Sequence, residues 1–247
     1  MILRRVTAHV KTQNWFAVAL DLLIVIVGVF IGIEVANWNE ARQERSEERR
    51  YYSQLLVDLR TDLQTFALAE RRTRDFDQAA EWVLAKLGGK PPREVSSGRL
   101  AAAIHYAGFI YLPTVNRRTY DELISTGNLG LLRDQRIRSD IAAYYGKFAE
   151  IRQWDALLRE QQNVYWTETA GVLPRHVLRT AIRGPEPEVS AREAKEIWEV
   201  ARSRARLPDL LIGMAAHQER VRSGSELLTT RATELIVEIE RHLAESA

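Results

Sequence analysis

Residues 14–40 read NWFAVALDLLIVIVGVFIGIEVANWNE, and this stretch decides how the chain is organised. A nearly unbroken apolar run from Leu22 to Ile33 lies between Trp15 and Trp38, which stand where the aromatic belts of a membrane protein would be. A helix rises ~1.5 Å per residue, so the stretch between the two tryptophans spans roughly 35 Å and can cross a hydrocarbon layer of ~30 Å. The sequence therefore predicts a transmembrane helix over residues 15–38, after a short basic tail over residues 1–14.

The apolar run is too long for the apolar region of a cleaved signal peptide. Residues 34–38 read EVANW, which contains no small-x-small cleavage site. We therefore expect a signal anchor that is retained in the mature protein.

Basic residues beside the span bear on its orientation, because the side richer in Lys and Arg tends to stay in the cytoplasm. Arg4, Arg5 and Lys11 precede the span, and four arginines follow it closely, so the count alone is near a tie. The basic residues of the short tail are undiluted, whereas those after the span alternate with glutamates. This pattern favours a cytoplasmic N-terminus with the main domain outside the cytoplasm, and the opposite orientation stays open.

Composition excludes several classes of protein. The 247 residues include 35 basic and 33 acidic ones, closely interleaved, with a net charge of +2. A nucleic-acid-binding protein would have a lopsided basic surface, so we expect no nucleic-acid partner. Cysteine is absent, which rules out disulfides, thiolate metal sites and a cysteine nucleophile.

The chain after the span has the pattern of helices. From Asn39 to Leu87 there is no Pro and no Gly, which predicts one long helix, or two nearly collinear ones, over residues 39–87. The GGKPP of residues 88–92 ends it. No segment alternates with the period of a strand over a useful length. We predict an all-α fold in which the transmembrane helix continues into the long helix, followed by an antiparallel helical bundle over residues 97–247. Residues 39–247 would form a soluble, all-helical domain.

Local signals predict where the bundle helices begin and end. A serine cap favours a helix over residues 100–112, and Asp134 is a candidate cap for a helix that runs over residues 135–166. Gly127 is expected in the left-handed conformation after a short helix. The sequence from Ser190 to Glu193 reads SARE, the pattern of a capping box.

No motif in the sequence indicates catalysis. The histidines lie in different segments, without the Glu-x-x-His spacing of di-iron bundles or the His-Glu-x-x-His spacing of zinc proteases. A P-loop and a Gly-x-Ser-x-Gly elbow are also absent. We therefore expect no enzyme activity, no cofactor and no metal site.

One soluble stretch has residue types suited to a small anionic ligand. Arginine donors can hold a carboxylate or phosphate while tyrosines form an apolar wall. The residues that would line this possible ligand site are His105, Tyr106, Arg117, Arg118 and Tyr120. The alternative is a structural corner between two helices, in which Gly127 and Asn128 make the turn. We favour the structural corner.

One face of the span combines small and polar residues. Gly28 and Gly32 form a small-xxx-small motif that lets two helices approach closely, and at ~100° per residue Ala17, Asp21 and Val25 share their stripe. A membrane aspartate normally faces protein or water, although Asp21 can also reach the nearby interface. These five residues are the predicted helix–helix interface.

The anchor sequence, together with YDELISTGNL at residues 120–129 and the pair Tyr144-Tyr145, resembles a family of uncharacterised bacterial single-span membrane proteins with a domain of unknown function. The resemblance covers the anchor closely and the central domain loosely. It implies a location in the bacterial inner membrane, and it supplies no activity, ligand or catalytic residue.

Two hypotheses on function follow. The first is a membrane-anchored interaction or structural protein whose partners are the lipid bilayer and a second copy of the chain or another membrane protein. The second is an extracytoplasmic sensory or ligand-binding module that uses the site near Tyr106 and Arg117.

Overall fold

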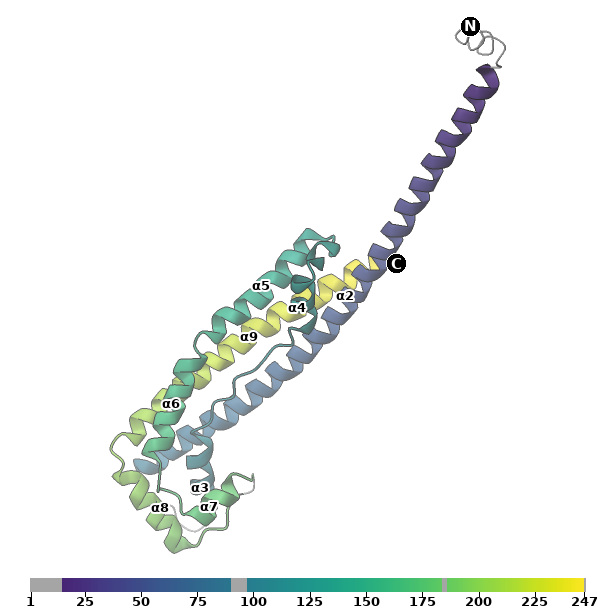
Figure 1. The fold of residues 1–247 in the computed structure, drawn as a ribbon. Coiled ribbons are helices and arrows are strands. Elements are labelled where there is room, and N and C mark those ends of the chain that lie inside the picture. The colour runs from purple at the N-terminus through teal and green to yellow at the C-terminus, as the bar shows by residue number, and fades with distance from the viewer. Residues whose placement is uncertain (1–14, 90–96, 184–185, 247) are drawn as a thin grey trace, which may run out of the picture. The chain divides into compact units, whose positions relative to one another are not determined.

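The structure is a computed structural model that describes residues 15–89, 97–183 and 186–246. These residues form α-helices and one short 3-10 helix, with no strand among them, so the predicted all-α class is confirmed (Figure 1). The chain divides into two compact units, Met1–Tyr51 and Tyr52–Ala247. The predicted basic tail, residues 1–14, lies outside the described residues.

Helix α2 (Trp15–Leu87) is one continuous helix of 73 residues, as the absence of helix breakers after the span predicts. In the first unit its large apolar side chains between Leu22 and Ile33 are 47% to 66% exposed. An 18-residue window of this helix is apolar and long enough to cross a membrane, and none of it is buried inside the structure. This one helix is therefore a candidate membrane span by length and composition.

In the second unit the core face of α2 repeats with alternating steps of three and four residues. The buried positions that follow this repeat are Tyr52, Leu55, Leu59, Asp62, Phe66, Ala69, Thr73, Phe76, Ala80, Val83 and Leu87. Such steps average 3.5 residues, which is the repeat of left-handed coiled coils. Most of these positions are apolar, and a polar side chain at such a position helps to fix the register of the packed helices.

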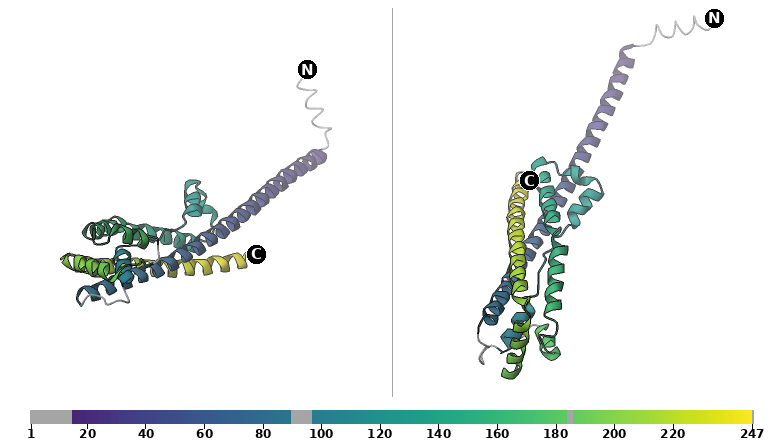
Figure 2. Two further views of the ribbon diagram at one scale, coloured as in Figure 1. Left: turned by 90° about the horizontal axis from the view of Figure 1, so that it is seen from below. Right: turned by 90° about the vertical axis from the view of Figure 1, so that its left-hand side faces the viewer.

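Helix α9 (Leu207–Glu245) carries the matching seam. Its buried positions with the same steps are Leu207, Leu211, Met214, Gln218, Val221, Ser225, Leu228, Ala232, Leu235 and Ile239. The helix runs beside the second half of α2 in the opposite direction (Figures 1 and 2). Tyr52 packs on the ring of His242 with a centroid distance of 5.1 Å, whereas Val83 shares a core cluster with Met214.

Helices α5 (Gln135–Arg152) and α6 (Asp155–Glu168) both pack against α9. Asp134 caps α5 by accepting hydrogen bonds from two backbone N–H groups, as predicted. The predicted single helix over residues 135–166 is wrong, because the chain turns at Gln153 and Trp154. The turn carries Arg152 at the end of α5 and Asp155 at the start of α6, so each charge suits its helix dipole.

One end of the bundle is closed by α3 (Ser97–Tyr106), α7 (Arg175–Ala181) and α8 (Ala191–Ser203). The capping box of Ser190 and Glu193 is confirmed at the start of α8. The indole Nε1 of Trp198 donates to the carbonyl of Lys86 at 3.1 Å, which satisfies a carbonyl in the last turn of α2.

The predicted helix over residues 100–112 is too long, because α3 ends at Tyr106. Beyond it the backbone carbonyls of Gly108 and Phe109 accept hydrogen bonds from the side-chain amides of Gln162 and Gln218. The amide of Gln162 on α6 replaces the backbone N–H that a longer helix would have brought to the carbonyl of Gly108. The carbonyl of Phe109 would have had no such partner, because Pro113 lacks an N–H, and the amide of Gln218 on α9 bonds it instead. An irregular segment then leads to α4 (Arg118–Ser125) and the 3-10 helix η1 (Asn128–Leu131), joined at Gly127 with φ of 72°, as predicted.

Candidate functional site

The predicted ligand-site residues of α3 lie in an aromatic cluster. His105 is buried, and its ring is 4.9 Å from that of Phe109 and 5.4 Å from that of Trp166, centroid to centroid. Burial lowers the pKa of His105, so the ring is neutral at pH 7. Tyr106 stacks on Phe76 of α2 at 6.4 Å. These side chains pack against one another.

The predicted ligand-site residues around α4 lie elsewhere. Tyr120 stacks on Tyr145 of α5 with a centroid distance of 4.3 Å, and the guanidinium of Arg117 lies over both rings. Arg117 also forms an ion pair of 2.9 Å with Asp121, so its charge has a partner within the same turn. The backbone N–H of Arg118 donates to the side chain of Asn116, as at a helix start.

The two groups do not form one pocket. Tyr106 contacts α2 at Phe76, whereas the backbone N–H of Thr119 donates to the carboxylate of Asp58 on the same helix. These two positions of α2 are 18 residues apart, which is about 27 Å along a helix. The predicted site with His105 and Tyr106 beside Arg117 is therefore not formed, and the structural-corner interpretation fits the residues around α4.

Two buried carboxylates of α2 hold this corner in place. Asp62, which is 1% exposed, accepts 2.7 Å hydrogen bonds from the backbone N–H of Asn116 and from the hydroxyl of Tyr144. Asp58 is fully buried, and its Oδ1 has no hydrogen-bond partner among the described residues. The hydroxyl of Tyr145 donates to the carbonyl of Asn116 at 3.1 Å.

The electrostatics of this cluster oppose ionisation. The pKa of Asp62 is raised to about 6. Burial is the largest cause and the charge of Asp58 adds to it, whereas the hydrogen bonds from Asn116 and Tyr144 act to lower the pKa. Burial and the nearby carboxylate also raise the pKa of Tyr144, which therefore stays a hydrogen-bond donor. The cluster therefore positions the segment before α4. No group of three potential metal ligands occurs within the described residues.

Sequence reasoning missed both aspartates. A signal existed, because steps of three and four residues from Tyr52 place Asp62 on the core seam between Leu59 and Phe66. Leu63, the apolar residue next to Asp62, is only partly buried.

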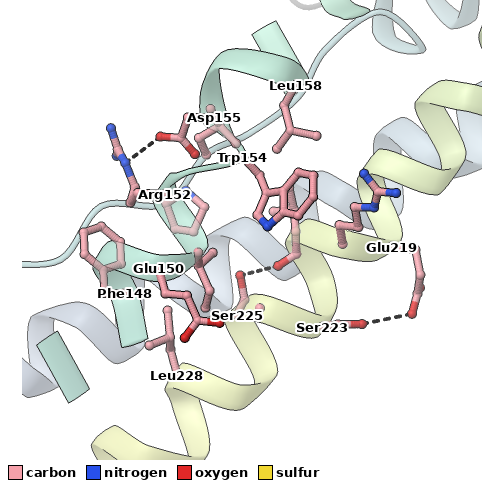
Figure 3. A pocket seen from close by; sticks show the side chains of 16 residues that line it. Phe148, Glu150, Arg152, Trp154, Asp155, Leu158, Glu219, Ser223, Ser225 and Leu228 are labelled. Atoms are coloured by element: carbon pink, nitrogen blue, oxygen red, sulfur yellow. Dashed lines mark hydrogen bonds and ion pairs between the residues drawn. The ribbon is translucent and has the colours of Figure 1, made fainter. Parts of the chain in front are cut away.

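A groove between the α5–α6 turn and α9 is a second candidate site (Figure 3). It has a volume of about 410 Å³. The buried side chains of Phe148, Leu158 and Leu228 line it, and the 54% exposed indole of Trp154 stands at its edge. The lining is therefore mostly apolar, with charged side chains around it.

The predicted helix–helix interface of the span, in the first unit, is not covered by other described parts of the chain. A Cβ placed on Gly28 or Gly32 would meet no atom within 4 Å, and Val25 is 60% exposed. Asp21 is also exposed. The side chain of Ala17 lies outside the described residues. Within the described chain, then, nothing covers the glycines of this face.

No known protein family matches the chain, and no curated protein or solved structure matches it either. The resemblance to uncharacterised single-span bacterial proteins therefore stays an expectation based on the anchor and residues 120–129.

Proposed function

We propose that the chain is a membrane-anchored interaction protein of the bacterial inner membrane. Its first unit crosses the bilayer once and associates there with a second copy or another membrane protein, while its second unit is a helical bundle outside the cytoplasm. The observation that supports this function is the uncovered apolar part of α2. No catalytic role is part of the proposal.

The exposed apolar side chains favour lipid over water. Ten large apolar residues between Leu22 and Ile33 are each about half exposed or more. Monomeric soluble proteins rarely expose contiguous apolar patches larger than a few hundred Å². In a bilayer the same surface meets an apolar solvent, and Trp38, which is 60% exposed, suits the interface together with the nearby guanidinium of Arg42.

The glycine face favours association inside the bilayer. Lipid tails are as apolar as the helix, so helices gain contact mainly by close packing at small residues and by interhelical hydrogen bonds. Gly28 and Gly32 offer close approach, and Asp21 on the same stripe offers a hydrogen bond typically worth about 0.6–2 kcal/mol in membranes.

Energy transfer between labelled copies tests this association. The chain has no cysteine, so one cysteine introduced at exposed Ser203 gives a single labelling site. Full-length chains labelled with donor or acceptor are mixed in lipid vesicles at low protein-to-lipid ratio. We expect energy transfer that falls strongly when Gly28 and Gly32 are both replaced by leucine, because the larger side chains hold the backbones apart.

Leu23→Ala is the matched control, since Leu23 lies on another side of the span and its loss should leave energy transfer nearly unchanged. Equal energy transfer in the double-leucine variant and the parent would show that the glycine face meets only lipid.

The orientation in this proposal follows the short basic tail. A reporter that is active only after translocation, fused after Ala247, should be active in bacterial cells. Activity of a cytoplasmic reporter at the same position would place the bundle in the cytoplasm instead.

A further inference from the structure

The groove between the α5–α6 turn and α9 has the dimensions of a small-molecule site. Its volume of about 410 Å³ falls within the range of roughly 300–1,000 Å³ in which such sites lie. Loop residues Leu112 and Pro113 line it together with residues of α5, α6 and α9, so segments far apart in the sequence form its walls.

An aromatic side chain stands unburied at the groove. Trp154 occupies the turn between α5 and α6 and remains 54% exposed (Figure 3). Its ring stands beside a floor formed by the buried side chains of Phe148, Leu158 and Leu228. A planar apolar molecule in this groove would cover the indole and the floor together.

The charges at the groove are paired with one exception. Arg152 pairs with Asp155 at 2.5 Å, Glu219 pairs with Arg222 at 2.6 Å, and Glu150 pairs with Lys147 at 2.8 Å; all of these carboxylates line the groove. Arg220 lines it too and has no ion pair within the described parts of the chain. Its guanidinium lies 5.4 Å from the centroid of the Trp154 ring. The cation that lacks an anion thus lies beside the exposed aromatic ring.

The groove floor contains a glycine inside a helix. Gly224 lies within α9, where glycine costs about 1 kcal/mol relative to alanine. A Cβ on Gly224 would lie 3.4 Å from Cγ2 of Ile151, which is van der Waals contact across the groove. A side chain at this position would therefore narrow the space between α5 and α9.

We infer that this groove binds a small molecule that combines a planar apolar body with one carboxylate. The body lies against Trp154 and the apolar floor, and the carboxylate pairs with the guanidinium of Arg220, which offers a fork of donors suited to it. This binding site belongs to the second unit and does not depend on association of the span.

Equilibrium dialysis with two matched probes tests the inference. The full-length chain is placed in lipid nanodiscs and dialysed against 2-naphthoate or against the uncharged 2-naphthamide, with empty nanodiscs to correct for partition into lipid. We expect saturable binding of 2-naphthoate, about tenfold tighter than that of the amide, because only the acid gains the charge-assisted bond to Arg220.

Two variants separate the parts of the site. Arg220→Gln should weaken 2-naphthoate about tenfold, to the level of the amide, and leave the amide unchanged. Trp154→Ala should weaken both probes, because it removes the aromatic wall. Arg231→Gln, at an exposed position of α9 that does not line the groove, is the control and should bind as the parent does.

Gly224→Leu should abolish binding of both probes by filling the groove, provided that its circular dichroism and thermal unfolding match those of the parent. Absence of saturable 2-naphthoate binding, or equal affinity for acid and amide in the parent, would overturn the inference. If neither probe binds and Trp154→Ala lowers energy transfer between labelled copies, a second copy occupies the groove and the inference also fails.

Discussion

Asp62→Asn should change the way the stability of the bundle depends on pH. In the folded chain the pKa of Asp62 is about 6, compared with 3.8 for the unperturbed carboxyl. The folded state therefore binds the proton more tightly than the unfolded state does. Because the pKa is raised on folding, this group stabilises the fold fully below pH 3.8, and the contribution is lost as the pH rises through about 6.

The magnitude follows from the two pKa values. Each pH unit between them adds about 1.4 kcal/mol to the free energy of unfolding, so the parent chain gains about 2 kcal/mol through Asp62 between pH 7.5 and pH 4.5. Asparagine cannot ionise and lacks this gain. The stability of the parent minus that of Asp62→Asn should therefore rise by about 2 kcal/mol over the same range.

The comparison with the variant is needed because other groups titrate in this range. Burial lowers the pKa values of His105 and His217, so they destabilise the fold as the pH falls below about 6.5. Their effect is present in both proteins and cancels in the difference.

The assay is urea unfolding of the full-length chain in mild detergent, followed by circular dichroism at both pH values. Asp75→Asn, at an exposed position of the same helix, reports the effect of removing a surface carboxylate. A parent-minus-variant difference that stays within about 0.5 kcal/mol between the two pH values would refute the assignment of the raised pKa to Asp62.

Urea unfolding at pH 7.5 also measures the stability of three further variants, one of which is compared at pH 4.5 as well. Gly108→Ala places a Cβ 2.5 Å from the ring of Tyr165 and should destabilise the fold by about 1–3 kcal/mol; no loss would mean that this close approach is not present in solution. Gly146→Ala meets no atom within 4 Å inside α5 and should stabilise it by about 0.5–1 kcal/mol, and a loss would contradict the open surface there. Tyr144→Phe removes the donor to Asp62 and should cost about 1.5–3 kcal/mol; the cost should shrink at pH 4.5, and an equal cost at both pH values would contradict a charged acceptor.

The features that the sequence predicted well depend on neighbouring residues. Asp134 and the pair Ser190 and Glu193 cap helices through backbone groups within one turn, so their patterns are visible locally. Gly127 takes a left-handed conformation that few other residues adopt, and this also marks the turn from the sequence alone. The long helix α2 was predictable because no Pro or Gly interrupts residues 39–87.

The features that could not be predicted from the sequence depend on residues far away in the chain. The turn at Trp154 contains neither Gly nor Pro, so no local signal marks it. The early end of α3 depends on Gln162 and Gln218, which supply donors from α6 and α9. Such tertiary hydrogen bonds override a helical pattern, and a single sequence does not show which side chains will meet.

For the candidate sites, too, the sequence shows the chemistry of neighbouring residues but not which distant residues meet. The five residues of the predicted ligand site share suitable chemistry, but the sequence carries no information on the roughly 27 Å along α2 that separates their two groups. The groove was hidden for a similar reason, since Trp154, Arg220 and Gly224 come from segments whose packing decides whether they meet. Asp62 was accessible in principle, because its place on the core seam of α2 can be read from spacing alone.

Cysteine labelling in native membranes tests the membrane anchor most directly. Val27→Cys and Ser203→Cys each introduce the only thiol of the chain, and both positions are exposed in the structure. Bacterial cells with a permeabilised outer membrane are treated with a membrane-impermeant maleimide. We expect rapid labelling at position 203 and none at position 27 until the membrane is dissolved in denaturing detergent. Labelling of position 27 as fast as that of position 203 in intact membranes would contradict a span buried in lipid.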